Sequence, residues 1–125
     1  DFEEEFVKFE KAFSKENYVE DGKNKSEVKC KHCNSKILLK KSAAFFEQEI
    51  NIPIVQQKVG GDVADEPVQL FWHVNNMYTF ENIGFSHTVN NFKYLTCADC
   101  EIGPIGYHDI TTQQNYVCIA RVDHV

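Results

Sequence analysis

Residues 97–106 have the sequence Cys-Ala-Asp-Cys-Glu-Ile-Gly-Pro-Ile-Gly, and residues 30–33 have the sequence Cys-Lys-His-Cys. Each Cys-x-x-Cys pair places two sulfur atoms on one tight turn, and four thiolates in a tetrahedron are a standard structural zinc site. We therefore predict one bound Zn²⁺ with four ligands: Cys30, Cys33, Cys97 and Cys100. Because such a set leaves no open position for water or substrate, the metal is expected to be structural and not catalytic.

The sequence leaves two alternatives to this zinc site open. The four cysteines could instead be free thiols or redox pairs, and His32, which lies inside the first pair, could compete as a ligand. We expect His32 to point outward. Because binding of structural zinc is coupled to folding, we expect chelation or Cys97→Ala to unfold the domain.

Composition limits the classes of function that are open to the chain. Its 125 residues suit one domain, and a hydrophobic fraction of 42% suffices for a small core. The net charge of −6 disfavours nucleic-acid phosphates and anionic lipid and favours a basic protein partner. No apolar run approaches the roughly 18 residues of a membrane helix, and no pattern of a signal peptide is visible. We expect a cytoplasmic monomer that does not bind nucleic acid or insert into membranes.

The order of apolar and turn-forming residues predicts a mainly β domain over residues 27–125, preceded by an N-terminal extension over residues 1–26. In the extension, Phe2, Phe6, Phe9 and Phe13 have helical spacing, so we expect a short amphipathic helix that docks on the domain's own surface, followed by a polar linker. A contact of this helix with a partner is the alternative. Many short strands without alternating helices indicate antiparallel sheets. The expected strands are 37–39, 45–52, 70–74, 78–85, 92–96, 105–110 and 116–122, with a loop at 56–68.

Three segments resemble a known family. Residues 80–85 (Phe-Glu-Asn-Ile-Gly-Phe), 93–95 (Lys-Tyr-Leu) and above all 97–108 resemble the Mss-type Rab-interacting factors, which are small zinc proteins that bind Rab GTPases of the secretory pathway. The resemblance extends over residues 28–125. It implies twisted antiparallel β-sheets of the "β-tent" type, shared with translationally controlled tumour protein and the B-type methionine sulfoxide reductases. It also implies one structural zinc ion on the four cysteines.

The resemblance further implies a regulatory function without bond-making chemistry. The family binds nucleotide-free Rab GTPases, promotes the release of GDP and holds the empty GTPase as a chaperone in vesicular transport. By the family pattern, Asp99 contacts the GTPase; the alternative is that Asp99 is a solvated carboxylate or a hydrogen-bond acceptor beside the metal. At position 76 the family often carries an acid, so Asn76 weakens any charge contact there. The expected surface also includes Glu101, Asn76, Met77, Tyr78, Phe80 and Glu81.

Two other classes of function compete with this interpretation. A methionine sulfoxide reductase-like enzyme would use Cys118 as its nucleophile, which requires an exposed and electropositive setting. The neighbours of Cys118 in sequence are apolar and Arg121 is the only nearby cation, so we expect a buried structural cysteine. A zinc-ribbon module that binds nucleic acid would need a basic stripe, and this acidic chain has none.

Overall fold

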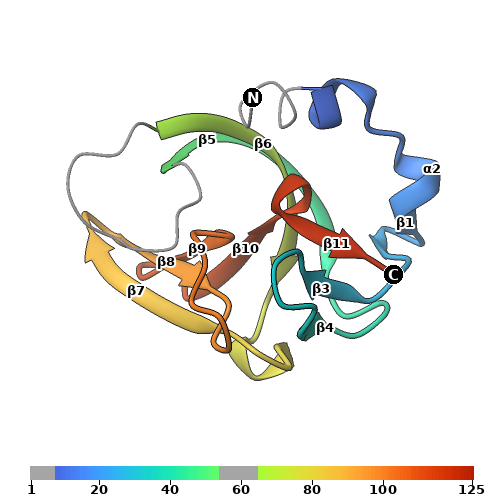
Figure 1. Ribbon diagram of the computed structural model, residues 1–125. Coiled ribbons are helices and arrows are strands. Elements are labelled where there is room, and N and C mark those ends of the chain that lie inside the picture. The colour runs from blue at the N-terminus through green and yellow to red at the C-terminus, as the bar shows by residue number, and fades with distance from the viewer. Residues whose placement is uncertain (1–7, 54–64) are drawn as a thin grey trace.

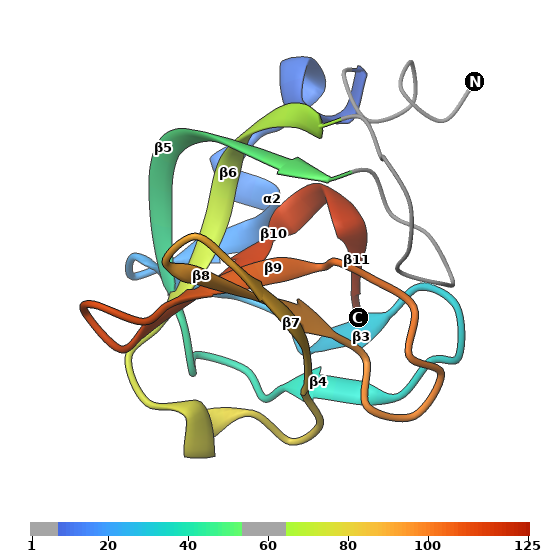
Figure 2. The same ribbon diagram turned by 90° about the vertical axis from the view of Figure 1, so that its left-hand side faces the viewer.

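A computed structural model describes residues 8–53 and 65–125, and this part of the chain forms two antiparallel sheets (Figure 1). The larger sheet has eight strands in the order β1-β2-β5-β6-β10-β9-β8-β7, and the smaller sheet has three in the order β11-β3-β4. Figure 2 shows how strongly β5 and β6 curve around the rest of the molecule. The expectation of a mainly β fold with antiparallel sheets and only short helices is confirmed.

The strands are short except for β5 and β6. The larger sheet consists of β1 (Val19–Glu20), β2 (Lys23–Asn24), β5 (Ala44–Pro53), β6 (Asp65–Val74), β7 (Gly84–Val89), β8 (Phe92–Thr96), β9 (Gly106–Asp109) and β10 (Gln114–Cys118). The smaller sheet consists of β3 (Val28–Cys30), β4 (Lys36–Leu38) and β11 (Val122–His124). The helical segments are residues 8–12, α2 (Lys15–Tyr18) and the 3₁₀ turns η1 (Met77–Thr79) and η2 (Ile119–Arg121). None of these described helices has the length and apolar character needed to span a bilayer.

Both faces of the larger sheet contribute to the hydrophobic core. Because successive residues of a strand point to opposite faces, Trp72 lies in one cluster and its neighbour Phe71 in the other. The Trp72 cluster also contains Val28 and Ile37 of the smaller sheet, so it fills the layer between the two sheets. Burial of each such large apolar side chain contributes about 1.5–3 kcal/mol to folding. This layer holds the two sheets, and with them the two cysteine pairs, in a fixed relation.

Two predicted strands are wrong in part. Residues 77–79 form η1 instead of a strand, because Asn76 Oδ1 accepts a hydrogen bond from the backbone N of Tyr78 at 2.9 Å and caps the turn. Strand β7 begins only at Gly84. The predicted strand 116–122 is interrupted by η2, where the chain passes from the larger sheet to the smaller one. Of the predicted loop 56–68, residues 65–68 belong to β6 and the rest lies outside the described residues.

The N-terminal extension is more ordered than a linker. Residues 15–26 hold α2 and the β1–β2 hairpin, and Lys23 of β2 pairs with Ala44 of β5. Strands of two residues are too short to show an alternating pattern, and for this reason the sequence indicated only polar turns.

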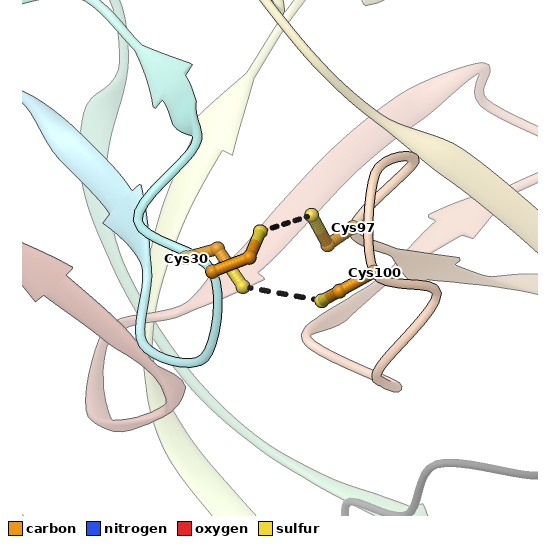
Figure 3. A group of neighbouring side chains, drawn as sticks. Cys30, Cys97 and Cys100 are labelled. Atoms are coloured by element: carbon orange, nitrogen blue, oxygen red, sulfur yellow. Dashed lines mark hydrogen bonds between the residues drawn. The ribbon is translucent and has the colours of Figure 1, made fainter.

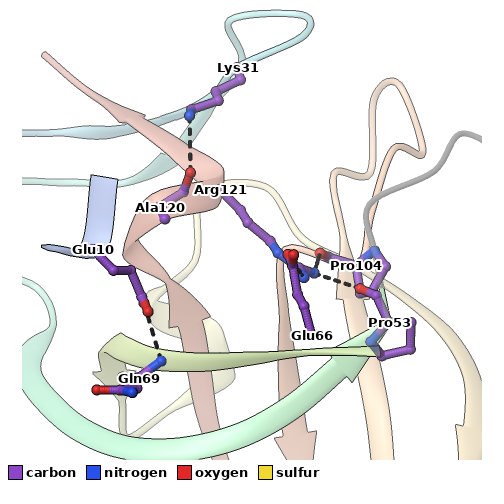
Figure 4. A network of polar contacts seen from close by, with 8 residues as sticks. All are labelled: Glu10, Lys31, Pro53, Glu66, Gln69, Pro104, Ala120 and Arg121. Carbon is purple, nitrogen blue, oxygen red and sulfur yellow. Dashed lines mark hydrogen bonds and ion pairs between the residues drawn. The ribbon is translucent and has the colours of Figure 1, made fainter. Parts of the chain in front are cut away.

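The helix over residues 8–12 docks on the domain, as expected. Phe9 and Phe13 pack against the core, and the rings of Phe13 and Phe45 stack with centroids 5.8 Å apart. Glu10 accepts a hydrogen bond from the backbone N of Gln69 at 3.2 Å (Figure 4). It also accepts one from the backbone N of Leu70 at 3.1 Å. The other two phenylalanines of the predicted helix, Phe2 and Phe6, lie outside the described residues.

A buried ion pair joins three distant segments of the chain (Figure 4). Arg121 Nη2 lies 2.6 Å from Glu66 Oε1, and the two side chains are only 1% and 6% exposed. Arg121 Nη1 also donates to the carbonyl oxygens of Pro53 at 2.8 Å and Pro104 at 2.7 Å. This guanidinium therefore fixes the segment that follows the second cysteine pair against β6 and the end of β5.

Candidate metal centre and partner surface

The four cysteine sulfurs converge between the loop after β3 and the loop after β8 (Figure 3). The Sγ atoms of Cys30 and Cys100 are 3.6 Å apart, those of Cys33 and Cys97 are 3.5 Å apart, and all four lie within 4.8 Å of one another. These separations are too long for disulfides, in which sulfurs are about 2.05 Å apart. They approach the edge of about 3.8 Å that a tetrahedron has when its sulfurs lie about 2.3 Å from a zinc ion. The cluster could therefore hold a metal ion, and it consists of cysteines alone because the His32 side chain is exposed and outside it.

The two cysteine pairs have the same backbone turn. The residue after each pair, Asn34 or Glu101, has a left-handed φ of 65° or 62°. Its backbone N donates to the carbonyl oxygen of the first cysteine of its pair, at 3.0 Å for Cys30 and 2.8 Å for Cys97. Sequence analysis missed this backbone role of Glu101. The signal that could have indicated it is Asn34 at the equivalent position, since asparagine tolerates left-handed backbone.

Two glycines after the second pair are required by close packing. A Cβ at Gly103 would lie 2.7 Å from Thr96 Cγ2, and a Cβ at Gly106 would lie 2.0 Å from the carbonyl oxygen of Tyr116. Any larger residue would push this segment away from β8 and β10. The glycines therefore hold the loop of the second pair tightly against the sheet.

Hydrogen bonds and burial shift the pKa values of the cysteine thiols in opposite directions. Hydrogen bonds with Ser35 lower the pKa of exposed Cys33 to about 6. Burial raises the pKa of Cys100 to about 12, and it also raises that of Cys30 despite a hydrogen bond to its Sγ from the backbone N of His32. A bound cation would favour the thiolate form of all four, because metal ligation displaces the thiol proton.

Asp99 is exposed, and its carboxylate also takes part in hydrogen bonds beside the cluster. Ser35 Oγ donates to Asp99 Oδ2, and Asn82 Nδ2 lies 3.4 Å from the same oxygen. The structure thus places Asp99 beside the sulfurs as a hydrogen-bond acceptor, while its side chain remains open to solvent. Neither Ser35 nor Asn82 was singled out from the sequence, because their partners are distant along the chain.

The other predicted partner residues divide into exposed and buried ones. Tyr78 is 89% exposed and Met77 is 38% exposed, and Asn76 and Glu81 are exposed as well. Figure 2 shows that η1 and the loop between β8 and β9 lie on the same lower side of the molecule. Phe80 does not belong to this surface. Its side chain is only 9% exposed and packs into the core layer between the sheets.

Cys118 has no accessible thiolate. Its side chain is fully buried, and burial raises the pKa of the thiol to about 12. A nucleophilic cysteine needs the opposite environment. The expectation of a buried structural cysteine is confirmed, and a reductase-like role for Cys118 is not supported.

Comparison with known proteins agrees with this geometry. Residues 23–124 match the family model described as Mss4 protein. A protein from Drosophila melanogaster, named guanine nucleotide exchange factor MSS4 homolog, is 45% identical over 109 residues, which are 85% of this chain and 89% of that protein. A protein of the same name from Schizosaccharomyces pombe is 29% identical over 83 residues, 66% of this chain and 80% of the relative. With the match to the family model extending over most of its length, this chain belongs to the Mss4 protein family.

Proposed function

We propose that this chain is a guanine nucleotide exchange factor for Rab GTPases that binds the nucleotide-free form and also holds it as a chaperone in vesicular transport. The observation that carries the proposal is the 45% identity, over 85% of the chain, to a relative named guanine nucleotide exchange factor MSS4 homolog. The exposed carboxylate of Asp99 beside the cysteine cluster and the exposed ring of Tyr78 on η1 support it. We place the protein in the cytoplasm as a monomer.

The metal is proposed to be one structural Zn²⁺ held by Cys30, Cys33, Cys97 and Cys100. Four soft thiolates at near-tetrahedral separations suit zinc, and a closed set of four protein ligands gives it a structural role. Structural zinc sites contribute on the order of 10–16 kcal/mol of apparent binding energy at neutral pH. Chelation or Cys97→Ala should therefore abolish the β-type circular dichroism spectrum. Metal analysis should find one zinc per chain, and an unchanged spectrum of the metal-free protein would contradict the structural role.

The turns of the two cysteine pairs, residues 30–33 and 97–100, are called the first and second knuckles. The GTPase-binding surface is proposed to lie on residues 27–125, on the side that carries the second knuckle and η1. Its members are Asp99, Glu101, Asn76, Met77, Tyr78 and Glu81. Tyr78 is a candidate anchor, because a large aromatic side chain that is 89% exposed can bury much area in a partner. The described helices of the extension, residues 8–12 and α2, lie on the opposite side of the molecule from η1, so we assign no member of this surface to them (Figures 1 and 2).

Exchange of this kind requires no bond to be made or broken. A ligand shifts an equilibrium only by its different affinities for two states, and each tenfold preference for the empty GTPase corresponds to about 1.4 kcal/mol. Linkage is reciprocal, so GDP must weaken the binding of this protein as much as this protein weakens the binding of GDP. The net charge of −6 suits the basic, phosphate-binding side of a GTPase that has lost its nucleotide.

The test is binding to a panel of Rab GTPases prepared empty, with GDP and with GTP, together with the release rate of a fluorescent GDP analogue. Binding restricted to the empty form and faster GDP release would support the proposal. Asp99→Lys should slow GDP release at least tenfold while zinc content and circular dichroism stay unchanged. Asp123→Lys, the same change at an exposed carboxylate of β11, is the matched control and should have little effect. No binding to any empty member of the panel would refute the function.

A further inference from the structure

Asn82 joins the two parts of the proposed GTPase-binding surface. It lies in the segment between η1 and β7, and its side chain reaches the second cysteine pair. Asn82 Oδ1 accepts a hydrogen bond from the backbone N of Ala98 at 3.0 Å. Its Nδ2 lies 3.4 Å from Cys97 Sγ and 3.4 Å from Asp99 Oδ2.

The chemistry of these contacts is specific to an amide. A carboxamide has two N–H donors and one carbonyl acceptor, so Asn82 can donate one hydrogen to the sulfur and one to the carboxylate while it accepts from Ala98. Cys97 as a thiolate and Asp99 as a carboxylate are both acceptors, and a neutral donor between them reduces their mutual repulsion. A hydroxyl group would supply a single donor hydrogen, and a carboxylate none.

Asp99 is held from the other side by the first cysteine pair. Ser35, two residues after Cys33, donates its hydroxyl hydrogen to Asp99 Oδ2. The carboxylate is therefore fixed between a group on the first knuckle and an amide on the segment that follows η1. Asn82 contacts both the sulfur of Cys97 and the carboxylate of Asp99, and it belongs to the segment that follows η1. A change at the cysteine cluster therefore reaches Asp99 and this segment through one side chain.

We propose that Asn82 is a positioning residue that couples metal binding by the cysteine cluster to the presentation of Asp99 and of the η1 segment to the GTPase. This inference rests on the proposed exchange function. Partners that donate to metal ligands typically change metal affinity 10–100-fold when they are lost. Loss of Asn82 should therefore weaken metal binding and, separately, release Asp99 from its fixed position.

The first arm of the test measures the metal site without any GTPase. Asn82→Ala removes all three hydrogen bonds. The nearly isosteric Asn82→Asp keeps the acceptor for the backbone N of Ala98, but it places a negative charge next to the Cys97 sulfur and the Asp99 carboxylate. Zinc affinity by competition with a chromogenic chelator should fall about 10-fold for Asn82→Ala and further, toward 100-fold, for Asn82→Asp. The sulfur-to-cobalt charge-transfer band of the Co²⁺-loaded protein should move to lower energy in both. Asn17→Ala, at an exposed asparagine of α2, is the control.

The expected order of zinc affinities, with Asn82→Asp weaker than Asn82→Ala, distinguishes a positioning role of Asn82 from a role in packing alone. If Asn82 only filled space, the isosteric aspartate would be the milder change and the charge-transfer band would stay in place. Unchanged zinc affinity in both variants, or an aspartate variant closer to the original protein than the alanine variant, would overturn the proposed link to the cluster.

The second arm is a double-mutant cycle on binding to the empty GTPase, at saturating zinc, with Asn82→Ala, Asp99→Ala and the double variant. If Asn82 acts through Asp99, Asn82→Ala weakens binding about 10-fold in the original chain and less than 2-fold in the Asp99→Ala background. Additive effects would overturn the coupling while leaving the exchange function intact. If the unmodified chain binds no member of the panel, the exchange function itself has failed, and with it the coupling to the GTPase.

Discussion

Glu66→Gln should cost about 3–5 kcal/mol of the free energy of unfolding, because it removes one partner of a buried ion pair. Arg121 Nη2 lies 2.6 Å from Glu66 Oε1, and the exposed fractions of the two side chains are 1% and 6%. Glutamine preserves the size of the side chain but removes the carboxylate that pairs with Arg121 Nη2, while the carbonyl oxygens of Pro53 and Pro104 still accept from Nη1. Breaking a buried pair in this way typically costs about 3–5 kcal/mol, a large part of a total stability of about 5–15 kcal/mol.

The assay is urea unfolding followed by circular dichroism at a fixed free-zinc concentration, so that metal binding contributes equally to each variant. With a slope of about 2 kcal/mol per molar urea, a loss of 3 kcal/mol lowers the midpoint by about 1.5 M. Glu27→Gln is the control, because the Lys36–Glu27 pair at 3.1 Å is far more accessible to solvent, with side chains 43% and 26% exposed, and should contribute less than about 1 kcal/mol. If Glu66→Gln costs no more than Glu27→Gln, the buried pair does not stabilise the segment after the second knuckle as argued.

Three further predictions concern single positions. Gly106→Ala should lower the free energy of unfolding by more than about 3 kcal/mol, because the new Cβ would lie 2.0 Å from the backbone oxygen of Tyr116. Gly84→Ala is the comparison in the same thermal or urea unfolding assay. It should cost much less, because the nearest atom to its Cβ is a side-chain oxygen at 3.0 Å. Glu101→Gly should be more stable than Glu101→Ala by about 1 kcal/mol in the same unfolding assay, because the φ of 62° penalises any residue with a Cβ; equal stability would exclude that strain. Burial and the nearby Lys31 charge lower the pKa of His124 to about 4, below its ordinary 6.5. The unfolded chain therefore binds the proton first as pH falls, and this position should lose about 2 kcal/mol of stability between pH 7 and pH 5. The loss is measured against His124→Asn, which keeps an acceptor for the buried indole N–H, and parallel pH profiles of the two proteins would contradict the prediction.

Local patterns in the sequence predicted the elements whose geometry is local. The predicted strand 92–96 coincides with β8. Exposure alternates over residues 92–94, and both Leu95 and Thr96 are buried where the strand enters the second cysteine pair. The cysteine pairs were equally clear, since a two-residue spacing places both sulfurs on one turn whatever the rest of the chain does. Residues 77–79 and 119–121 were missed as 3₁₀ turns, because three residues are too few for their spacing to distinguish a turn from a strand. None of the first three is buried and all of the second three are, so burial does not identify such turns either.

Long-range contacts decided the candidate site beyond its ligands. The sequence predicted that Asp99 lies inside the second knuckle, and it could not show that Ser35 and Asn82 would bind its carboxylate from two other segments. It gave no signal for the pairing of Glu66 with Arg121, which are 55 positions apart. Phe80 and Tyr78 are both aromatic and two residues apart, yet only packing determines that Phe80 is buried and Tyr78 exposed.

The sequence by itself determined the two Cys-x-x-Cys pairs and the mainly β class, because both depend on spacing that is local to a turn or a strand. The tertiary structure alone decided that the two knuckles meet at sulfur separations of 3.5 and 3.6 Å, and that Asn82 connects the segment after η1 to Cys97. The physical reason is that these contacts form between segments that are distant in the sequence and are brought together by the core layer between the sheets. The residue pattern of one segment does not determine which other segment packs against it.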